Sequence, residues 1–258
     1  MTSPDTAPAA IDIRGATKTY PNGTRALEPI DLTVRQGEFV TIVGPSGCGK
    51  STLLRLIAGL SPPTAGSMAL SEGHAPPRLA YVFQSPTLMP WASVQANVRL
   101  PLDLARAPRA EADEKTRHAL ELVGLQEFSA SFPRELSGGM QMRASIARAL
   151  VTEPRLLLMD EPFGALDEIT RNRLDREFSE LSARENLTVL FVTHSIYEAV
   201  FLSSRVLVMS PRPGRIHTEV NIDAPRPRAD SFRGTVKFAT HSAQLSEMLG
   251  FAMQETGR

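Results

Sequence analysis

Cysteine is almost absent from this sequence, with Cys48 alone among 258 residues. One thiol cannot form an intramolecular disulfide, and no cysteine cluster is left for zinc or an iron-sulfur centre. Long apolar runs are missing too, since candidates such as Leu156–Met159 and Val189–Val192 have only the length of strands. A membrane-spanning helix needs roughly 20 apolar residues. We therefore expect a protein of a reducing compartment that does not itself span a bilayer.

Neither sign of charge is in excess. Lys and Arg together number 28, Asp and Glu together number 28, and the formal net charge is zero. Domains that bind nucleic acid normally carry a basic excess, so we expect no nucleic-acid partner. We interpret Arg226, Arg228 and Arg233 as solvated surface that could also face lipid headgroups. The hydrophobic share of 42% is enough for a buried core and excludes a wholly disordered chain.

Strand-like and helix-like patterns alternate through most of the chain. Alternating apolar residues around a Pro-Asn-Gly turn predict an antiparallel hairpin or meander over residues 11–34. Short buried runs then alternate with helical spacing, which predicts a doubly wound α/β sheet. Strands are expected over 38–43, 78–83, 156–159, 188–192 and 206–209, and helices over 51–60, 111–123, 138–150, 168–183 and 196–202. Prolines and glycines predict turns over 61–77 and a loop around Pro101.

The pattern divides the chain into three parts. Residues 1–10 lack the basic start and apolar stretch of a signal peptide and are expected to form a flexible tail. Residues 11–220 are expected to form one domain of the size usual for nucleotide-binding domains, with a helical subdomain inserted at about 86–150. Residues 221–258 are expected to form a short C-terminal extension, helical from about Ser242 to Met253. The extension is too short for a sizeable regulatory domain.

A phosphate-binding loop is predicted between the strand over 38–43 and the helix that follows. The run is Gly44-Pro45-Ser46-Gly47-Cys48-Gly49-Lys50-Ser51, which matches G-x-x-x-x-G-K-[ST]. Its glycines let backbone N–H groups turn toward phosphate oxygens, and the helix N-terminus adds its positive dipole end. We expect Lys50 to reach the β- and γ-phosphates and Ser51 to bind Mg²⁺. The alternative is a glycine-rich turn that merely begins a helix, but the flanking strand and helix favour a nucleotide.

Two adjacent carboxylates follow the buried run Leu156-Leu157-Leu158-Met159. A carboxylate at the end of such a strand can hold the ligand shell of Mg²⁺, while the next carboxylate faces the attacking water. Asp160 is therefore the candidate metal residue, and Glu161 is the candidate catalytic residue. Taken alone, the pair is equally consistent with an acidic cap on the turn at Pro162.

Further motifs follow in a fixed order. The distinguishing run is Leu136-Ser137-Gly138-Gly139-Met140, between the phosphate-binding loop and the carboxylate pair. The others are Tyr20, Gln84, the run Ala165-Leu166-Asp167, and His194. Together these motifs resemble the ATPases of ABC transporters over about residues 11–220. Segments 83–91, 163–167 and 209–216 are similar, more narrowly, to the ATPases of nitrate, sulfonate and taurine importers.

The resemblance implies a P-loop NTPase of the ABC-ATPase fold, with a RecA-like core, an antiparallel β subdomain and an inserted helical subdomain. It also implies ATP and Mg²⁺ as cofactors and a head-to-tail homodimer that encloses each ATP between two chains. It assigns Glu161, His194 and Lys50 to catalysis, and Ser51, Gln84 and Asp160 to the metal. The nucleotide-binding residues that it assigns are Tyr20, Gly44, Pro45, Ser46, Gly47, Cys48, Gly49, Lys50, Ser51, Thr52, Gln84, Ser137, Gly138, Gly139 and Asp167.

Several of these residues also admit a plainer interpretation. Tyr20 could stack on adenine or simply cover the sheet, and His194 could contact the γ-phosphate or be a structural histidine. Trp91 could fill the core of the helical subdomain or line a groove for a helix of a membrane subunit. The helix N-terminus would depress the pKa of an exposed Cys48 thiol, whereas a buried one would be inert. Met140 stands where many family members have Gln and cannot make the same hydrogen bonds.

The function that these expectations predict is ATP hydrolysis that energises the import of a small solute. The implied partners are a second ATPase subunit, integral membrane permease subunits and, indirectly, an extracytoplasmic solute-binding protein. The chain would then lie peripherally on the cytoplasmic face of the cell membrane. Alternatives are another ABC transporter subfamily, a soluble ABC-type ATPase of DNA repair or translation, and a P-loop kinase. The segment from Lys50 to Ser137 is too short for the coiled coil of a repair ATPase, and a kinase has no use for the run at Ser137.

Overall fold

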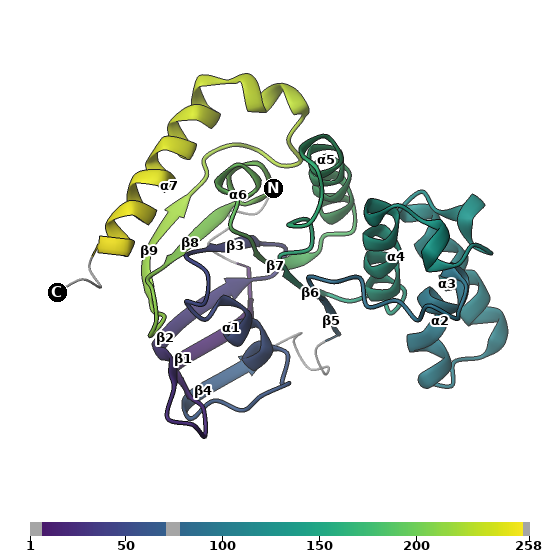
Figure 1. Ribbon diagram of the computed structural model, residues 1–258, viewed down its shortest axis with the longest axis horizontal. Coiled ribbons are helices and arrows are strands. Elements are labelled where there is room, and N and C mark those ends of the chain that lie inside the picture. The colour runs from purple at the N-terminus through teal and green to yellow at the C-terminus, as the bar shows by residue number, and fades with distance from the viewer. Residues whose placement is uncertain (1–6, 71–77, 255–258) are drawn as a thin grey trace.

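The computed structural model describes residues 7–70 and 78–254, and two sheets organise this part of the chain (Figure 1). The strands are β1 (Ala9–Thr19), β2 (Arg25–Arg35), β3 (Phe39–Val43), β4 (Ala65–Leu70), β5 (Leu79–Val82), β6 (Leu156–Asp160), β7 (Thr188–Val192), β8 (Arg205–Met209) and β9 (Ile216–Asn221). The helices are α1 (Lys50–Ile57), α2 (Val94–Leu104), α3 (Arg109–Leu122), α4 (Gly138–Leu150), α5 (Glu168–Arg184), α6 (Ile196–Leu202) and α7 (Val236–Gln254), with 3₁₀ turns η2 (Gln126–Phe128), η3 (Pro133–Glu135) and η4 (Asp230–Gly234). The predicted α/β fold is confirmed.

The larger sheet has the strand order β5-β6-β7-β3-β8-β9. All neighbouring pairs in it are parallel except β8 and β9. β3, β6 and β7 are buried at every residue, because layers cover both faces of the sheet, and this explains their continuous apolar runs. The sequence does not predict β9, which is buried only at Val220 and owes its conformation to pairing with β8.

The smaller sheet is antiparallel and has the order β2-β1-β4. The hairpin expected over 11–34 corresponds to β1 and β2, but β1 begins at Ala9, so residues 9 and 10 are not part of a tail. Residues 1–6 of the expected tail lie outside the described residues. The prediction of turns over 61–77 is wrong for β4, where Met68 pairs with Ile13. This pairing outweighs the local proline and glycine pattern, and residues 71–77 lie outside the described part.

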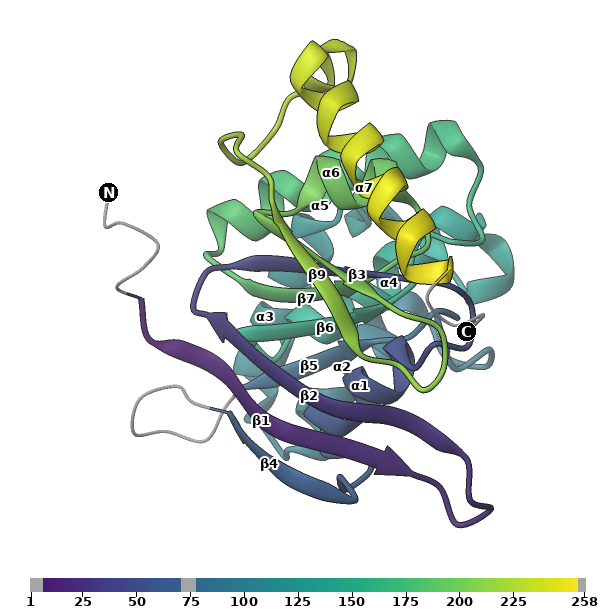
Figure 2. The ribbon, with the colours of Figure 1, turned by 90° about the vertical axis from the view of Figure 1, so that its left-hand side faces the viewer.

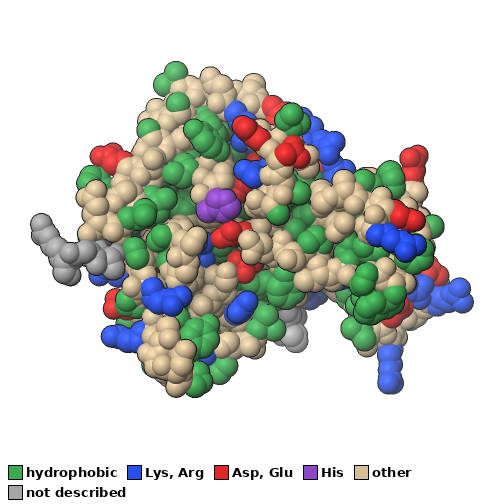
Figure 3. Space-filling view, viewed as in Figure 1, with side chains coloured by type: hydrophobic (Ala, Val, Ile, Leu, Met, Phe, Trp, Pro, Cys, Tyr) green, Lys and Arg blue, Asp and Glu red, His purple; other side chains and the backbone are tan. Residues whose placement is uncertain are grey.

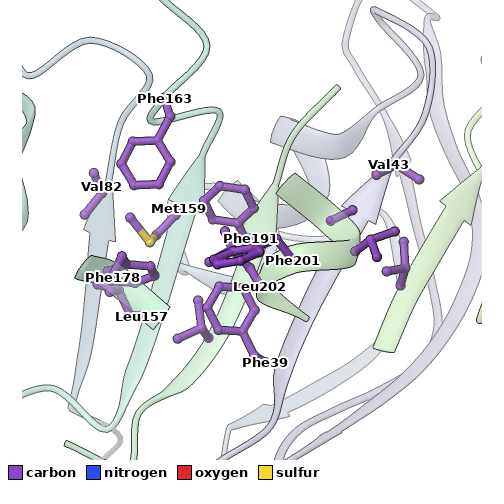
Figure 4. Close-up of a cluster of buried hydrophobic side chains, with 14 of the residues drawn as sticks. Phe39, Val43, Val82, Leu157, Met159, Phe163, Phe178, Phe191, Phe201 and Leu202 are labelled. Atoms are coloured by element: carbon purple, nitrogen blue, oxygen red, sulfur yellow. The ribbon is translucent and has the colours of Figure 1, made fainter. Parts of the chain in front are cut away.

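Two hydrophobic clusters cover opposite faces of the larger sheet. Alternate residues of β3 divide between them. Val40 and Ile42 pack with α1, β1 and β2, whereas Phe39 and Val43 pack with α4, α5, α6 and α7. Figure 2 shows α5, α6 and α7 on one side of the larger sheet and α1, β1 and β2 on the other. Figure 4 shows the aromatic cluster, where the ring centroids of Phe39 and Phe191 are 5.9 Å apart. Consequently α1 and α4 lie on opposite faces of one sheet.

The helices α2, α3 and α4 share a hydrophobic cluster of their own beside β5 (Figure 1). They occupy the part of the chain where an inserted helical subdomain is expected. The loop expected around Pro101 is wrong, since Pro101 lies inside α2. Proline removes one helical hydrogen bond, but Val98 and Leu102 bury this helix against its neighbours. Burial therefore outweighs the local signal.

The arginines of the C-terminal extension are not solvated surface, so that interpretation is wrong. Arg228 is buried and donates to the carbonyls of Val200 and Phe201 at the end of α6, where a helix favours a cation. The half-buried Arg226 lies over the ring of Phe39 at 4.6 Å, and Arg233 is likewise half-buried. The last helix begins at Val236, earlier than expected, because Phe238 is buried against the core.

None of the described helices combines the length and the apolar surface that a bilayer crossing requires.

Candidate active site

Four segments that carry predicted site residues meet at the carboxyl ends of adjacent strands. The phosphate-binding loop follows β3, the carboxylate pair ends β6, and His194 follows β7, in a sheet where the local order is β6-β7-β3. Gln84 follows β5, whose Val82 pairs with Met159. Ligands of parallel sheets bind at this edge, near a change in strand order. Figure 3 shows acidic, basic and histidine side chains gathered near the middle of the face it draws.

Glycines give the phosphate-binding loop its shape. Gly47 and Gly49 have φ values of 75° and 108°, which residues with a side chain rarely adopt. A Cβ atom on Gly49 would lie 2.6 Å from a methyl carbon of Leu27 and 2.9 Å from the carbonyl oxygen of Ala26. Gly49 caps α1 without offering a side-chain acceptor to the first N–H groups of the helix. Those N–H groups and the helix dipole suit phosphate oxygens.

The Lys50 ammonium group folds back over this loop. Its Nζ atom donates to the carbonyls of Gly44 at 2.9 Å and Pro45 at 3.0 Å, and only 5% of the side chain is exposed. The same Nζ atom lies 3.9 Å from Oε1 of Glu161. A cation anchored by two carbonyls needs little reorganisation to neutralise phosphate charge.

Oxygen atoms from three elements form the candidate metal site. Ser51 Oγ donates to Oδ1 of Asp160 at 2.8 Å, and the Tyr81 hydroxyl donates to Oδ2 at 3.1 Å. Burial and the charge of Asp160 raise the pKa of Tyr81, so this tyrosine remains a donor at neutral pH. A hydroxyl and a carboxylate are hard oxygen ligands of the kind that Mg²⁺ prefers when phosphate oxygens and water complete its shell. The third predicted metal residue, Gln84, is exposed beyond β5.

The donor set suits a metal that arrives with a nucleotide better than a free-standing metal centre. Within residues 7–70 and 78–254, no group of three or more His, Cys, Asp or Glu side chains is arranged to hold a metal ion. Ser51 and Asp160 would supply part of an octahedral shell for Mg²⁺, and phosphate oxygens and water would supply the rest.

Glu161 is held in a strained backbone conformation next to His194. Its φ of 47° lies in the left-handed region, although it is not glycine, and its N–H donates to the carbonyl of Val192 at 2.9 Å. Its Oε2 atom lies 3.1 Å from Nδ1 of His194. The Glu161 side chain is 21% exposed and that of His194 is 57% exposed. Strain of this kind persists where the surroundings enforce it, commonly at active sites.

Tyr20 lies beside the first turn of α1. Its hydroxyl is 3.2 Å from Oγ1 of Thr52, and the ammonium of Lys18 lies 5.5 Å from the ring centroid. The ring is half-buried. These contacts hold it at the edge of the phosphate-binding loop, and stacking on a base stays a prediction.

Cys48 is 1% exposed, so of the two alternatives the buried thiol is the one that the structure shows. Burial raises the pKa of the thiol, although the neighbouring Lys50 lowers it. The side chain packs in the cluster that includes α1, and a Cβ atom on Gly44 would lie 3.0 Å from its sulfur. Cys48 therefore acts as a small apolar residue inside the loop.

Two residues that the sequence analysis leaves without a role support the phosphate-binding loop from the β8–β9 connection. Arg212 Nε donates to the carbonyl of Gly47 at 3.1 Å. A Cβ atom on Gly214 would lie 1.9 Å from the carbonyl oxygen of Cys48, so only glycine fits there. The pair Pro213-Gly214 predicts a turn, but no local pattern indicates that this turn contacts the phosphate-binding loop, which is distant in sequence.

The run Leu136–Met140 begins α4. Ser137 is the N-cap, and its Oγ accepts a hydrogen bond from the N–H of Met140 at 3.3 Å. Ser137 and Gly138 are exposed. A Cβ atom on Gly139 would lie 2.9 Å from Cγ2 of Thr170, at the start of α5. The helix that this run begins packs on the face of the larger sheet opposite to α1.

Two neighbours of this run have clear structural roles. Met140 packs partly against the hydrophobic cluster of α2, α3 and α4, which explains an apolar residue at that position. Asp167 caps α5 by accepting a hydrogen bond from the N–H of Thr170 at 3.0 Å, and this bond lowers the pKa of Asp167.

Trp91 is 76% exposed, so its interpretation as a core residue is wrong. The loop that presents it is firmly held. Asn97, fully buried, accepts from the N–H of Met89 at 2.7 Å and donates to its carbonyl at 3.1 Å. Arg148 of α4 donates to the carbonyl of Thr87 at 2.8 Å. The segment after β5 is thus fixed by polar bonds while its indole faces outward.

Comparisons with known proteins identify the family of the chain. The family described as ABC transporter matches residues 27–164. An uncharacterised ABC transporter ATP-binding protein of Methanocaldococcus jannaschii is 45% identical, over 93% of this chain and 91% of that protein. The aliphatic sulfonates import ATP-binding protein SsuB of Rhodopseudomonas palustris is also 45% identical, over 94% of this chain and 84% of that protein. A dimeric ATP-binding cassette with bound ADP and Pi aligns with a TM-score of 0.72 and 31% identity, over 83% of this chain and all of that one.

Proposed function

Because this chain belongs to the ABC transporter family and is one of its ATPases, we propose that it energises the import of a small solute through a separate membrane permease. The observation that carries the proposal is the convergence of Lys50, Ser51, Asp160, Glu161 and His194 at one edge of the sheet. Hydrolysis requires a cation at the phosphates, a metal site and a base, and all three occur there.

In this proposal the residues of the site divide the work. Lys50 and the first N–H groups of α1 bind the β- and γ-phosphates, and Tyr20 stacks on the adenine. Ser51, Asp160 and Gln84 hold Mg²⁺, which when bound neutralises phosphate charge. Glu161 orients the attacking water and takes its proton, while His194 holds Glu161 and faces the γ-phosphate.

The proposal places the second half of each site on a second copy of the chain. α1 and the exposed N-terminus of α4 lie on opposite faces of one sheet, so one chain cannot bring both to the same phosphate. A head-to-tail copy would present Ser137 and Gly138, with the positive end of α4, to the nucleotide on the other chain. Asp167 would lie at the same interface.

A permease is proposed to dock on the face of the helical subdomain that carries Trp91. This side chain is 76% exposed although it is large and aromatic. Exposed apolar side chains held on a rigid loop suit a protein partner. Since Arg148 links this loop to α4, movement of the docked partner would reach the run at Ser137.

The proposed solute is a sulfonate, taurine, nitrate or a related small molecule. Support comes from the relative named for aliphatic sulfonates, which matches nearly the whole chain. Loss of growth on an alkanesulfonate as sole sulfur source, after deletion of this chain, is the expected result. Growth that stays normal on sulfonates but fails on nitrate or another solute would identify that other solute as the substrate.

The shared site is tested by mixing two inactive variants. Lys50→Ala disables the phosphate-binding side of a site, and Gly138→Asp places a negative charge on the opposing side. Each variant alone is expected to lose ATP hydrolysis, and a mixture should regain part of it, because a mixed dimer contains one site with both sides intact. A mixture that associates but stays as inactive as its parts contradicts a shared site.

The docking surface is tested with Trp91→Asp in the full transporter. The isolated variant should hydrolyse ATP as the wild type does, because Trp91 is exposed, yet it should no longer co-purify with membranes. Wild-type protein that never co-purifies with a membrane subunit would favour a soluble ABC-type ATPase instead.

A further inference from the structure

Two buried carboxylates and two half-buried arginines connect the C-terminal extension with α5 and α6. Asp175 of α5 and Glu198 of α6 are 0% and 3% exposed. Arg233 of η4 donates to Oδ2 of Asp175 at 2.7 Å, and Nε of Arg171 lies 3.4 Å from Oε1 of Glu198. Two guanidinium groups therefore face two carboxylates in a setting where an unpaired charge is costly.

Arg171 also holds the segment that precedes α5. Its Nη2 atom donates to the carbonyl of Leu166 at 2.7 Å, and its Nε atom donates to the carbonyl of Phe163 at 3.3 Å. Leu166 directly precedes Asp167, the N-cap of α5. One guanidinium is thus shared between a carboxylate and two carbonyls, and it links Glu198 to the segment 163–167.

Glu198 reaches the loop of His194 in a similar way. The hydroxyl of Thr193 donates to Oε2 of Glu198 and accepts from the N–H of Ser195 at 3.0 Å. Burial and repulsion by Asp175 raise the pKa of Glu198. The charge of Asp175 therefore acts on Glu198, which holds Thr193 at the start of the loop that carries His194.

We propose that Arg233 is a positioning residue of the ATPase, which neutralises Asp175 and so keeps Arg171 on the carbonyls that precede Asp167. Without Arg233, Asp175 attracts Arg171, which lies one helical turn away on α5. Arg171 then no longer donates to the carbonyls of Leu166 and Phe163. As a result, the segment 163–167 and the loop that carries His194 shift away from their positions in the site. The inference rests on the proposed function, because it assigns Asp167 and His194 to turnover.

The test compares Arg233→Met with Arg176→Met in the full-length chain. Methionine removes the charge of Arg233, whose guanidinium lies 4.0 Å from the ring centroid of Phe201, but leaves a long apolar side chain to cover that ring. Arg176 is the matched control, because it pairs with Asp230 at 2.6 Å between the same two elements, α5 and η4, but on the surface. Arg233→Met should lower kcat for ATP about fivefold or more, with KM within about twofold, since transition-state positioning alone is lost. Arg176→Met should leave both values within about twofold of the wild type.

The double variant Asp175→Asn/Arg233→Met separates positioning from general loss of stability. It removes one charge of each sign, so Arg171 is no longer drawn away, and kcat should recover toward the wild-type value. A double variant as slow as Arg233→Met overturns the inference, as does a wild-type kcat in Arg233→Met itself.

Arg233→Gln is the second variant if Arg233→Met does not fold, because glutamine can still donate a hydrogen bond to Asp175 but carries no charge. It should show the same loss of kcat at nearly constant KM, and an unchanged kcat overturns the inference. Absence of ATP hydrolysis in the wild-type chain would overturn the proposed function as well, whereas equal rates in wild type and variants overturn this inference alone.

Discussion

The Nδ1 atom of His194 lies 3.1 Å from Oε2 of Glu161, across the ends of the neighbouring strands β7 and β6. Glu161 is strained, with φ of 47°, and its N–H is tied to the carbonyl of Val192 on β7. The strand β7 therefore fixes both members of the pair: His194 follows its end, and Glu161 donates a hydrogen bond to its residue Val192. Such a pair is suited to orient a water molecule at a phosphate.

Glu161→Gln should retain ATP binding and lower the rate of ATP hydrolysis by about 100-fold or more, because the amide keeps the shape but accepts no proton. Phosphate release and equilibrium binding of ATP are the two measurements. Glu153→Gln is the matched control, since Glu153 also has a positive φ, 51°, but is exposed just before the amino end of β6, at the opposite end of this strand from Glu161. Near-normal hydrolysis by Glu161→Gln would rule out this carboxylate as the base.

Arg212→Ala should weaken ATP binding by about three- to tenfold, the range expected for one hydrogen bond to the carbonyl of Gly47. The loop loses a support on the side of the β8–β9 connection and samples more conformations. Titration with a fluorescent ATP analogue measures the change. Arg117→Ala, on an exposed pair with Glu121 in the helical subdomain, should leave affinity unchanged. If both variants bind ATP with equal affinity, Arg212 does not shape the phosphate-binding loop.

Cys48 should react with a thiol-alkylating reagent at least about 100 times more slowly in the folded protein than in denaturant. Burial raises the pKa of its thiol and blocks access. Mass spectrometry over a time course follows the single modification. The same slow rate is expected with and without ATP, and rapid labelling of the folded chain would contradict the burial.

The free energy of unfolding should fall as the pH rises above about 4.5, through the raised pKa of Glu198. In that range the unfolded chain releases this proton while the folded chain retains it, so the folded state loses relative stability until the folded pKa is passed. Urea unfolding at pH 5 and pH 8 measures the difference. Glu198→Gln should flatten the dependence by on the order of 1 kcal/mol, since one unit of pKa corresponds to about 1.4 kcal/mol.

The matched control for this pH dependence is Glu180→Gln on the exposed side of α5. It should leave the difference between the two pH values as in the wild type. An identical pH dependence in Glu198→Gln and in the wild type would show that Glu198 ionises normally.

Much of the candidate site could be predicted because its motifs are local. Gly47, Gly49 and Lys50 act through a turn and a helix N-terminus that neighbouring residues create, and Asp160 and Glu161 end a strand recognisable by its apolar run. Their roles in binding and turnover stay predictions. Tyr81, Arg212 and Gly214 could not be found this way, since each serves the site through a contact with a residue distant in sequence.

Burial was the property that local pattern predicted least well. Trp91 faces outward because Asn97 and Arg148 fix the loop around it, and Arg228 is buried because the end of α6 supplies carbonyls for its guanidinium. A polar residue enters a core only where partners satisfy it, and partners are assembled by the fold. The same reason explains β4, which forms because the edge of β1 accepts it.

The order of glycines, hydroxyls and carboxylates along the chain by itself determined the α/β fold and the family of this ATPase, because φ preferences, strand runs and helix caps act over a few residues. Only the tertiary structure decided that α1 and α4 take opposite faces of one sheet, and that Arg233 meets Asp175. Those relationships depend on how far-separated segments share one core, and no short stretch of sequence contains both partners.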